Sequence, residues 1–164
     1  MSKKSLLKVC ALFAVFFFGA AQLPVMAATC PEQTQEETAL RQRYAENTIL
    51  GFVKGLELNG KQVTPEQKEK MRRIVFDAFP ELIALVRKAG LYDEYKTQML
   101  DGDIRELDKK ILKAATMEEV VPLIQKEMAL INERYPKLVQ WLSSDPELQA
   151  FSARLMQKIA AVLQ

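Results

Sequence analysis

Apolar residues recur three and four positions apart through most of this chain, and that spacing limits its fold more than any other sequence feature. The clearest stripe consists of Met71, Ile74, Val75, Ala78, Phe79, Leu82, Ile83 and Val86. Charged residues such as Lys68 and Arg72 fall on the other side, as in a surface helix that covers a core. No segment alternates apolar and polar residues convincingly as a half-buried strand does. The sequence therefore predicts an all-α fold.

Helix starts and breaks divide the chain into five or six predicted helices. They cover about residues 36–58, 65–89, 91–100 with 104–112, 117–135 with 137–142, and 146–162. Thr34, Thr64 and Thr116 each stand three residues before a Glu or Gln, which is the capping-box pattern of a helix start. Pro80 and Pro122 fall inside apolar stripes and are expected to kink or divide their helices. We expect a compact bundle with several proline-kinked helices.

Two glycines weaken the first predicted helix. Gly51 and Gly55 form a Gly-x-x-x-Gly pair, a pattern that lets helices approach closely in membranes. Charged residues around the pair, including Glu46 and Lys54, argue against a membrane helix. We therefore expect both glycines to pack closely against a neighbouring helix of the bundle.

The first 27 residues have the parts of a secretory signal peptide. Lys3, Lys4 and Lys8 form a basic head, residues 9–21 form an apolar run, and small residues end at Ala27. The run of 13 residues is too short to cross a bilayer, so no membrane span is expected. The sequence predicts cleavage after Ala27, a flexible segment over 28–35 and a single helical domain over 36–164. The predicted location is periplasmic or secreted.

The charge balance argues against nucleic acid as a partner. The chain has 23 Lys plus Arg against 21 Asp plus Glu. The predicted leader holds three of the basic residues and none of the acidic ones, which leaves 20 basic against 21 acidic residues. Electrostatic binding of nucleic acid needs a clustered basic surface, and the basic residues here alternate with acids. We expect no nucleic-acid binding.

Cys30 is the one cysteine that remains after the predicted cleavage, because Cys10 lies in the leader. A lone cysteine cannot form an internal disulfide. In an oxidising compartment it is free, capped or paired with a second chain, so a homodimer through Cys30 is one alternative. Residues 27–29 lack the large apolar residue and the very small residue of a lipoprotein signal, and we expect no lipidation.

The chain contains no histidine, which removes the commonest general base and the commonest metal ligand. Ser143 and Cys30 lack a partner base for nucleophilic catalysis. Asp101, Gly102 and Asp103 lack the remaining positions of a calcium loop and are expected to break a helix. We expect no acidic residue to stand in an apolar context that would raise its pKa conspicuously. We expect no enzyme, metal or cofactor, with an unrecognised carboxylate-based activity as the open alternative.

Aromatic and methionine residues supply the candidate contacts for a partner. Most fall on apolar stripes, where core packing is the ordinary interpretation. Trp141 and Met117 fit the stripes least well and are candidate exposed anchors, and Tyr92 and Tyr95 are further candidate contacts. We expect a non-enzymatic helical protein that binds a protein or peptide, as a chaperone or an adaptor. The alternatives are a dedicated inhibitor or immunity-type protein, or a carrier of a small apolar ligand between helices kinked at Pro80 and Pro122.

Residues 63–67 read Val-Thr-Pro-Glu-Gln and open a basic, amphipathic helix. This segment resembles the Leu-Thr-x-x-Gln motif of the Spy/CpxP-like periplasmic family, with Val63 in place of the usual Leu. The family usually has a second copy of the motif, which residues 142–146 do not match. The resemblance implies an all-helical envelope protein that binds exposed apolar segments without ATP on a concave cradle. It carries over Thr64 and Gln67 alone, and both are interpreted as cap residues.

Overall fold

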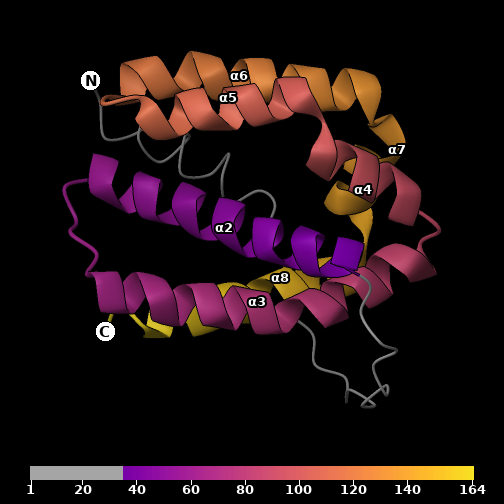
Figure 1. The fold of residues 1–164 in the computed structure, drawn as a ribbon, viewed down its shortest axis with the longest axis horizontal. Helices are drawn as coiled ribbons and strands as arrows, with labels where there is room; N and C mark the ends of the chain where they lie inside the picture. The colour runs from indigo at the N-terminus through magenta and orange to yellow at the C-terminus, as the bar shows by residue number, and fades with distance from the viewer. Residues whose placement is uncertain (1–34) are drawn as a thin grey trace.

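The computed structural model describes residues 35–164, and these form seven α-helices and no strand (Figure 1). The helices are α2 (Gln35–Leu58), α3 (Pro65–Lys88), α4 (Tyr92–Leu100), α5 (Gly102–Lys113), α6 (Met117–Arg134), α7 (Pro136–Ser144) and α8 (Pro146–Ala161). The all-α prediction is confirmed. The number exceeds the predicted five or six because the breaks at Asp101 and Tyr135 both separate complete helices. The predicted leader and Cys30 lie outside the described residues.

The start of α3 has the predicted cap. The main-chain N–H of Gln67 donates to Thr64 Oγ1 at 3.1 Å, and the main-chain N–H of Thr64 donates to Gln67 Oε1 at 3.0 Å. Pro65 occupies the first helical position, where its missing N–H costs no hydrogen bond. Thr64 and Gln67 are therefore cap residues, as interpreted from the sequence.

Pro80 and Pro122 lie inside the continuous helices α3 and α6, so neither proline divides its helix. A proline leaves the carbonyl oxygen four residues earlier without a helical donor, and for Pro80 this is the oxygen of Phe76. Arg41 Nε on α2 donates to that oxygen at 2.6 Å. A side chain from the neighbouring helix thus replaces the missing hydrogen bond, and α3 runs on for two more turns.

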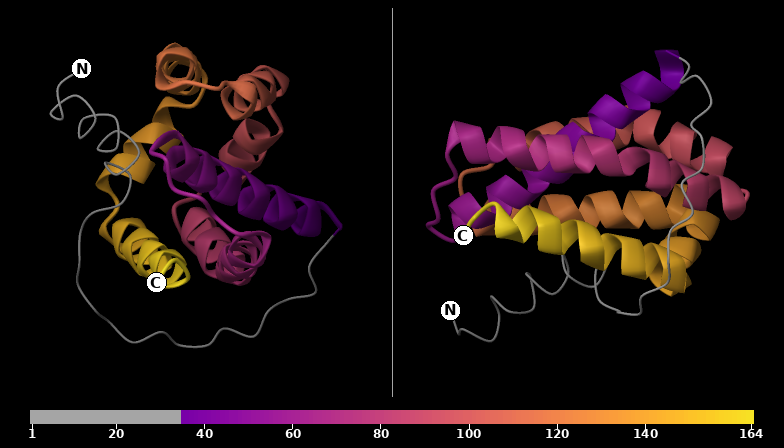
Figure 2. Two further views of the ribbon diagram at one scale, coloured as in Figure 1. Left: turned by 90° about the vertical axis from the view of Figure 1, so that its left-hand side faces the viewer. Right: turned by 90° about the horizontal axis from the view of Figure 1, so that it is seen from below.

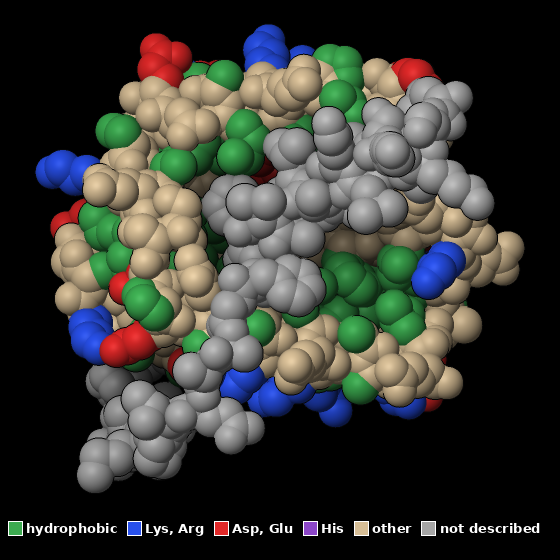
Figure 3. Space-filling model, turned by 180° about the vertical axis from the view of Figure 1, so that it is seen from behind, with side chains coloured by type: hydrophobic (Ala, Val, Ile, Leu, Met, Phe, Trp, Pro, Cys, Tyr) green, Lys and Arg blue, Asp and Glu red, His purple; other side chains and the backbone are tan. Residues whose placement is uncertain are grey.

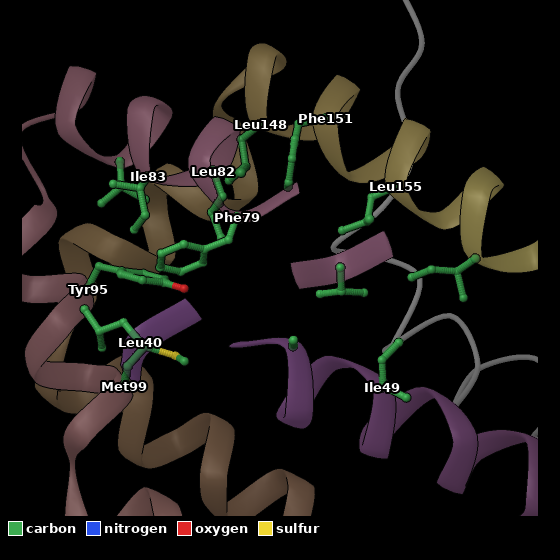
Figure 4. Close-up of a cluster of buried hydrophobic side chains, with 14 of the residues drawn as sticks. Leu40, Ile49, Phe79, Leu82, Ile83, Tyr95, Met99, Leu148, Phe151 and Leu155 are labelled. Carbon is green, nitrogen blue, oxygen red and sulfur yellow. The ribbon is translucent and has the colours of Figure 1, made fainter. Parts of the chain in front are cut away.

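The main core forms around α3, which packs against α2 on one side and α8 on the other. Met71, Val75, Phe79 and Val86 are at most 1% exposed, which confirms the predicted stripe. Figure 4 shows Phe79 and Leu82 of this helix among Leu40 of α2, Tyr95 of α4 and Phe151 of α8.

The helices form an open arc. Contacts between these helices run in the order α8, α3, α2, α5, α6, and the contact between α2 and α5 is the smallest of the series. Figure 2 shows this arc nearly end on, with α6 and α8 at its two ends. The short helices lie toward one end of the molecule, where α4 packs on α2 and α3 and α7 connects α6 to α8.

A second, smaller apolar cluster lies near the tip of the α5–α6 hairpin. Its buried members are Ile111, Ala114 and Val120, and Leu58 at the end of α2 packs against it. The hairpin therefore has its own core, separate from the main one.

The expected close packing of Gly51 and Gly55 is wrong. Among the described residues, a Cβ atom placed on either glycine would meet no heavy atom within 4 Å outside its own helix backbone and chain neighbours. Neither glycine therefore packs closely against another described helix. Within residues 35–164, no helix is long and apolar enough to cross a membrane.

Candidate functional site

The open side of the arc holds the candidate site. We call the hollow between α6 and α8, which α7 bounds at one end, the α6–α8 groove. Figure 3 views this side of the molecule, where hydrophobic side chains gather on either side of a hollow. A concave apolar face of this kind is the usual form of a ligand or peptide site.

Contacts with α5 fix how α6 is turned. Arg134 binds Asp101 and Asp103 of α5, and Glu127 is hydrogen-bonded to Asp108 of α5. These contacts define the row of α6 that faces its hairpin partner. Successive helical residues are about 100° apart, so the residue after Glu127 points well away from α5.

Next to the row of α6 that faces α5 lies a row of apolar residues, here called the α6 stripe. Its members are Met117, Val121, Ile124, Met128 and Ile131, spaced three and four residues apart, and all five are half-buried. Two of them are methionines, whose flexible side chains adapt to differently shaped apolar surfaces. Ile124 packs partly against the smaller apolar cluster and Ile131 partly against the main core, so Met117, Val121 and Met128 are the members of the α6 stripe left to face the groove.

The other two helices at the groove contribute half-buried apolar side chains as well. Trp141 and Leu142 on α7 and Met156 on α8 pack partly against the main core and keep part of their surface accessible. Met156 directly follows Leu155, whose side chain points into the core. The borders of the groove are therefore apolar on all three helices.

The structure places the two predicted anchors at different ends of the groove. Met117 is the first residue of α6, and Trp141 lies on α7, beyond the other end of α6. The 18 residues of α6 span about 27 Å, so the two side chains do not form one compact patch. Both are half-buried, and Trp141 packs partly against the main core.

The two tyrosines lie elsewhere. Tyr95 is 6% exposed and belongs to the main core, and its hydroxyl has no hydrogen-bond partner among the described residues. Burial raises its pKa well above the usual range. Tyr92 is half-buried, with its hydroxyl donating to Glu37 at 3.4 Å and the Arg87 guanidinium 4.8 Å from its ring centre. The structure therefore does not bring the tyrosines to the groove.

A polar cluster lies where the hairpin meets α2. Asp108 of α5 and Glu127 of α6, here called the carboxyl pair, are hydrogen-bonded to each other. Asn47 of α2 donates to Asp108 Oδ2 at 3.3 Å. Arg43 of α2 is the nearby cation, and its buried Nε has no hydrogen-bond partner within residues 35–164. Two carboxyl groups can hydrogen-bond only when they share a proton.

The carboxyl pair is electrostatically unusual. Burial and the neighbouring Asp108 raise the pKa of Glu127 to about 7. Burial also raises the pKa of Asp108, against the opposing charge of Arg43. Burial, and then the like charge of Arg105, lowers the pKa of Arg43. The pair can therefore hold one proton near neutral pH and lose it in mild base.

The expectation that no acid stands in an apolar context is wrong for Glu127. This residue is three positions after Ile124 and four before Ile131, so it occupies an inward-facing position of an apolar helix. Asp108 likewise lies between the buried Leu107 and Ile111. The positions of Glu127 and Asp108 among apolar residues are the signal that the sequence offers. The pairing of α5 with α6, which brings the two carboxyl groups together, cannot be predicted from spacing within one helix.

Asp101 and Asp103, at the break between α4 and α5, stabilise the base of the α5–α6 hairpin. Asp101 Oδ1 accepts the main-chain N–H of Asp103 at 2.9 Å, and Oδ2 accepts from the Tyr135 hydroxyl at 2.8 Å and from Arg134 at 2.8 Å. Partial burial opposes ionisation, but these hydrogen bonds lower the pKa of Asp101 to about 2. Asp101 therefore caps α5 and ties it to the end of α6, as a helix break should.

No cluster of three or more potential metal ligands occurs within residues 35–164. Comparison of the chain with protein-family models, with curated proteins and with solved structures gives no match. The groove and the polar cluster are therefore the two features of the described residues that bear on function.

Proposed function

We propose that the protein is an exported, non-enzymatic helical binding protein that holds apolar segments of other polypeptides in the α6–α8 groove. The observation that carries the proposal is the open arc, whose free edge is lined by the α6 stripe and by apolar residues of α7 and α8. Grooves between helices commonly receive the apolar face of a helical or extended segment.

The chemistry of the groove suits varied partners. Met117, Met128 and Met156 supply flexible apolar side chains, and Trp141 supplies a large rigid surface at one end. The chain predicted after cleavage has a nearly balanced charge, so recognition would depend on apolar contact more than on electrostatic steering. The resemblance of residues 63–67 to the Spy/CpxP-like motif agrees with this class of function.

An aggregation assay tests the proposal. Protein purified after export is mixed with a chemically denatured client, and light scattering is followed as the client is diluted into buffer. Met128→Glu and Met156→Glu place a charge at the groove, where desolvation on client binding should reduce the apparent affinity about tenfold. Leu100→Glu is the matched control, because Leu100 is 48% exposed on α4.

We expect the unaltered protein and Leu100→Glu to suppress aggregation equally, and both groove variants to need about ten times more protein. Equal activity of all four proteins would place client binding elsewhere. Absence of suppression by the unaltered protein would contradict the proposal.

Two further measurements separate this function from its alternatives. Capture of one co-purifying protein at equal stoichiometry would replace the proposal with a dedicated inhibitor or immunity-type role. Mass spectrometry of an organic-solvent extract would identify a small apolar ligand, and such a ligand at equal stoichiometry would replace it with a carrier role.

A further inference from the structure

The α5–α6 hairpin is held together by contacts of its own at its base and at its tip. Its base is tied together by Arg134, which binds Asp101 and Asp103 at 2.8 and 2.6 Å. Its tip has the smaller apolar cluster that contains Ile111 and Val120, against which Leu58 of α2 also packs. The contacts within the hairpin are more extensive than those between α5 and α2. A small change in free energy at the α5–α2 contact would therefore alter the position of the hairpin more than the same change between α5 and α6.

The carboxyl pair lies at that contact and interrupts its apolar packing. Along α5, Ile104 belongs to the main core and Ile111 to the tip cluster, and Asp108 stands midway between them. Asn47 is hydrogen-bonded to Asp108 across the contact. A polar layer between two apolar clusters is stable only if its groups are paired and its charges are balanced.

The charges at this layer balance when the pair holds one proton. On α2, Arg43 faces Asp108, and the exposed Glu46 acts on Arg43. On α5, the exposed Arg105 repels Arg43, and on α6 Glu127 meets Asp108. One proton leaves the pair with a single negative charge beside Arg43. Loss of that proton leaves two neighbouring carboxylates against one partly buried cation.

We propose that the carboxyl pair is a proton-operated latch that holds the α5–α6 hairpin against α2 when protonated and loosens it when the proton is lost. Protonated Glu127 donates to Asp108 and neutralises the layer, whereas two carboxylates repel each other and attract water into the contact. The pKa of Glu127, raised to about 7 by burial and by Asp108, places the change near neutral pH.

The latch has a consequence for the groove. α6 carries the α6 stripe, so a loosened hairpin would change the separation of α6 from α8 and with it the width of the groove. This consequence depends on the proposed function, but the latch itself depends only on the packing of the hairpin. The test therefore measures the hairpin without any client.

Pulsed electron paramagnetic resonance between two nitroxide labels tests the latch. The labels are placed at Lys113 near the hairpin tip and at Lys158 on α8, both exposed, in exported protein carrying Cys30→Ser. We expect a narrow distance distribution at about pH 5.5 and a broader, longer one at about pH 8.5, with a midpoint near 7. Glu127→Gln keeps a neutral donor beside Asp108 and should remain narrow throughout.

Glu133→Gln is the matched control, because Glu133 is exposed on the same helix and should respond to pH like the unaltered protein. An unchanged distribution in the unaltered protein, or a response of Glu127→Gln equal to that of the control, would overturn the latch. If Glu127→Gln does not fold, a carboxyl NMR titration of the unaltered protein decides. A midpoint near 7 for Glu127 supports the latch, and one near 4.5 overturns it.

A moving hairpin in a protein that binds no client would leave the latch intact and contradict only the proposed function.

Discussion

Arg41 and Phe76 are joined twice across the α2–α3 contact. Arg41 Nε donates to the Phe76 carbonyl oxygen at 2.6 Å, and the Arg41 guanidinium carbon lies 3.8 Å from the centre of the Phe76 ring. The carbonyl is free because Pro80 has no N–H to give it. The charged donor and the ring contact together compensate for a proline in the middle of the central helix.

Replacement of Arg41 should destabilise the protein, and the size of the loss should depend on whether Pro80 is present. Arg41→Met keeps the apolar stem but removes the donor, and we expect a loss of about 1–3 kcal/mol in the free energy of unfolding. In a Pro80→Ala background the alanine N–H can bond to Phe76, so the same substitution should cost less. Chemical denaturation of the four proteins gives the coupling, and a coupling of zero would contradict the compensation.

The capping aspartate at the hairpin base should be a second sensitive position. Asp101→Ala removes the cap of α5 and leaves the Tyr135 hydroxyl and Arg134 without their acceptor, so we expect a loss of roughly 2–3 kcal/mol. Asp101→Asn retains a cap and should cost less. Thermal unfolding followed by circular dichroism measures both, and equal losses would show that the cap contributes little.

The Asp101 carboxyl also predicts that the stability of the protein decreases in acid. The pKa of Asp101 is lowered to about 2 from 3.8, so its contribution to stability is present above pH 3.8 and is lost as the pH falls through about 2. Unfolding of the unaltered protein across this range should show that loss, relative to Asp101→Asn at each pH. A constant difference between the two proteins would contradict the lowered pKa.

The carboxyl pair predicts a pH dependence of stability with the opposite sign. The pKa of Glu127 is raised from 4.5 to about 7, so its contribution is present below pH 4.5 and is lost as the pH rises through about 7. Stability should fall by up to about 3 kcal/mol over this range, and Glu127→Gln should remove most of that fall. Denaturant unfolding at about pH 5 and pH 8 measures it, with Glu133→Gln as the control.

Two glycines of α2 should be replaceable with a gain in stability. Gly51→Ala and Gly55→Ala add a methyl group where no heavy atom of residues 35–164 beyond the helix itself lies within 4 Å, and each should stabilise the helix by roughly 0.5–1 kcal/mol. Thermal unfolding of the single variants checks this. A loss of stability at either position would mean that the space beside α2 is filled.

Local signals in the sequence predicted the helices well. The Thr64 capping box and the α3 stripe depend on residues three and four apart, and both appear as expected. The continuity of α3 through Pro80 depends on Arg41, which lies 35 residues from Phe76 in the sequence. A pattern within one helix cannot report such a compensating contact.

The candidate site is harder to predict from the sequence than the helices are, because it too depends on contacts between helices. Trp141 and Met117 fit their stripes poorly, which local spacing shows, but the groove depends on how the arc places α6 and α8. Glu127 was missed because its neighbour Asp108 comes from another helix. Burial of an acid becomes conspicuous only when the pairing of α5 with α6 is known.

The most direct test of the central claim uses the single tryptophan of the chain, Trp141, as a reporter at the groove. An apolar peptide without tryptophan is titrated into the exported protein while the Trp141 emission is recorded. We expect a saturable blue shift in the unaltered protein and in Leu100→Glu, and binding about tenfold weaker in Met128→Glu. Equal binding by Met128→Glu and Leu100→Glu, or no shift in the unaltered protein, would contradict a polypeptide site in the α6–α8 groove.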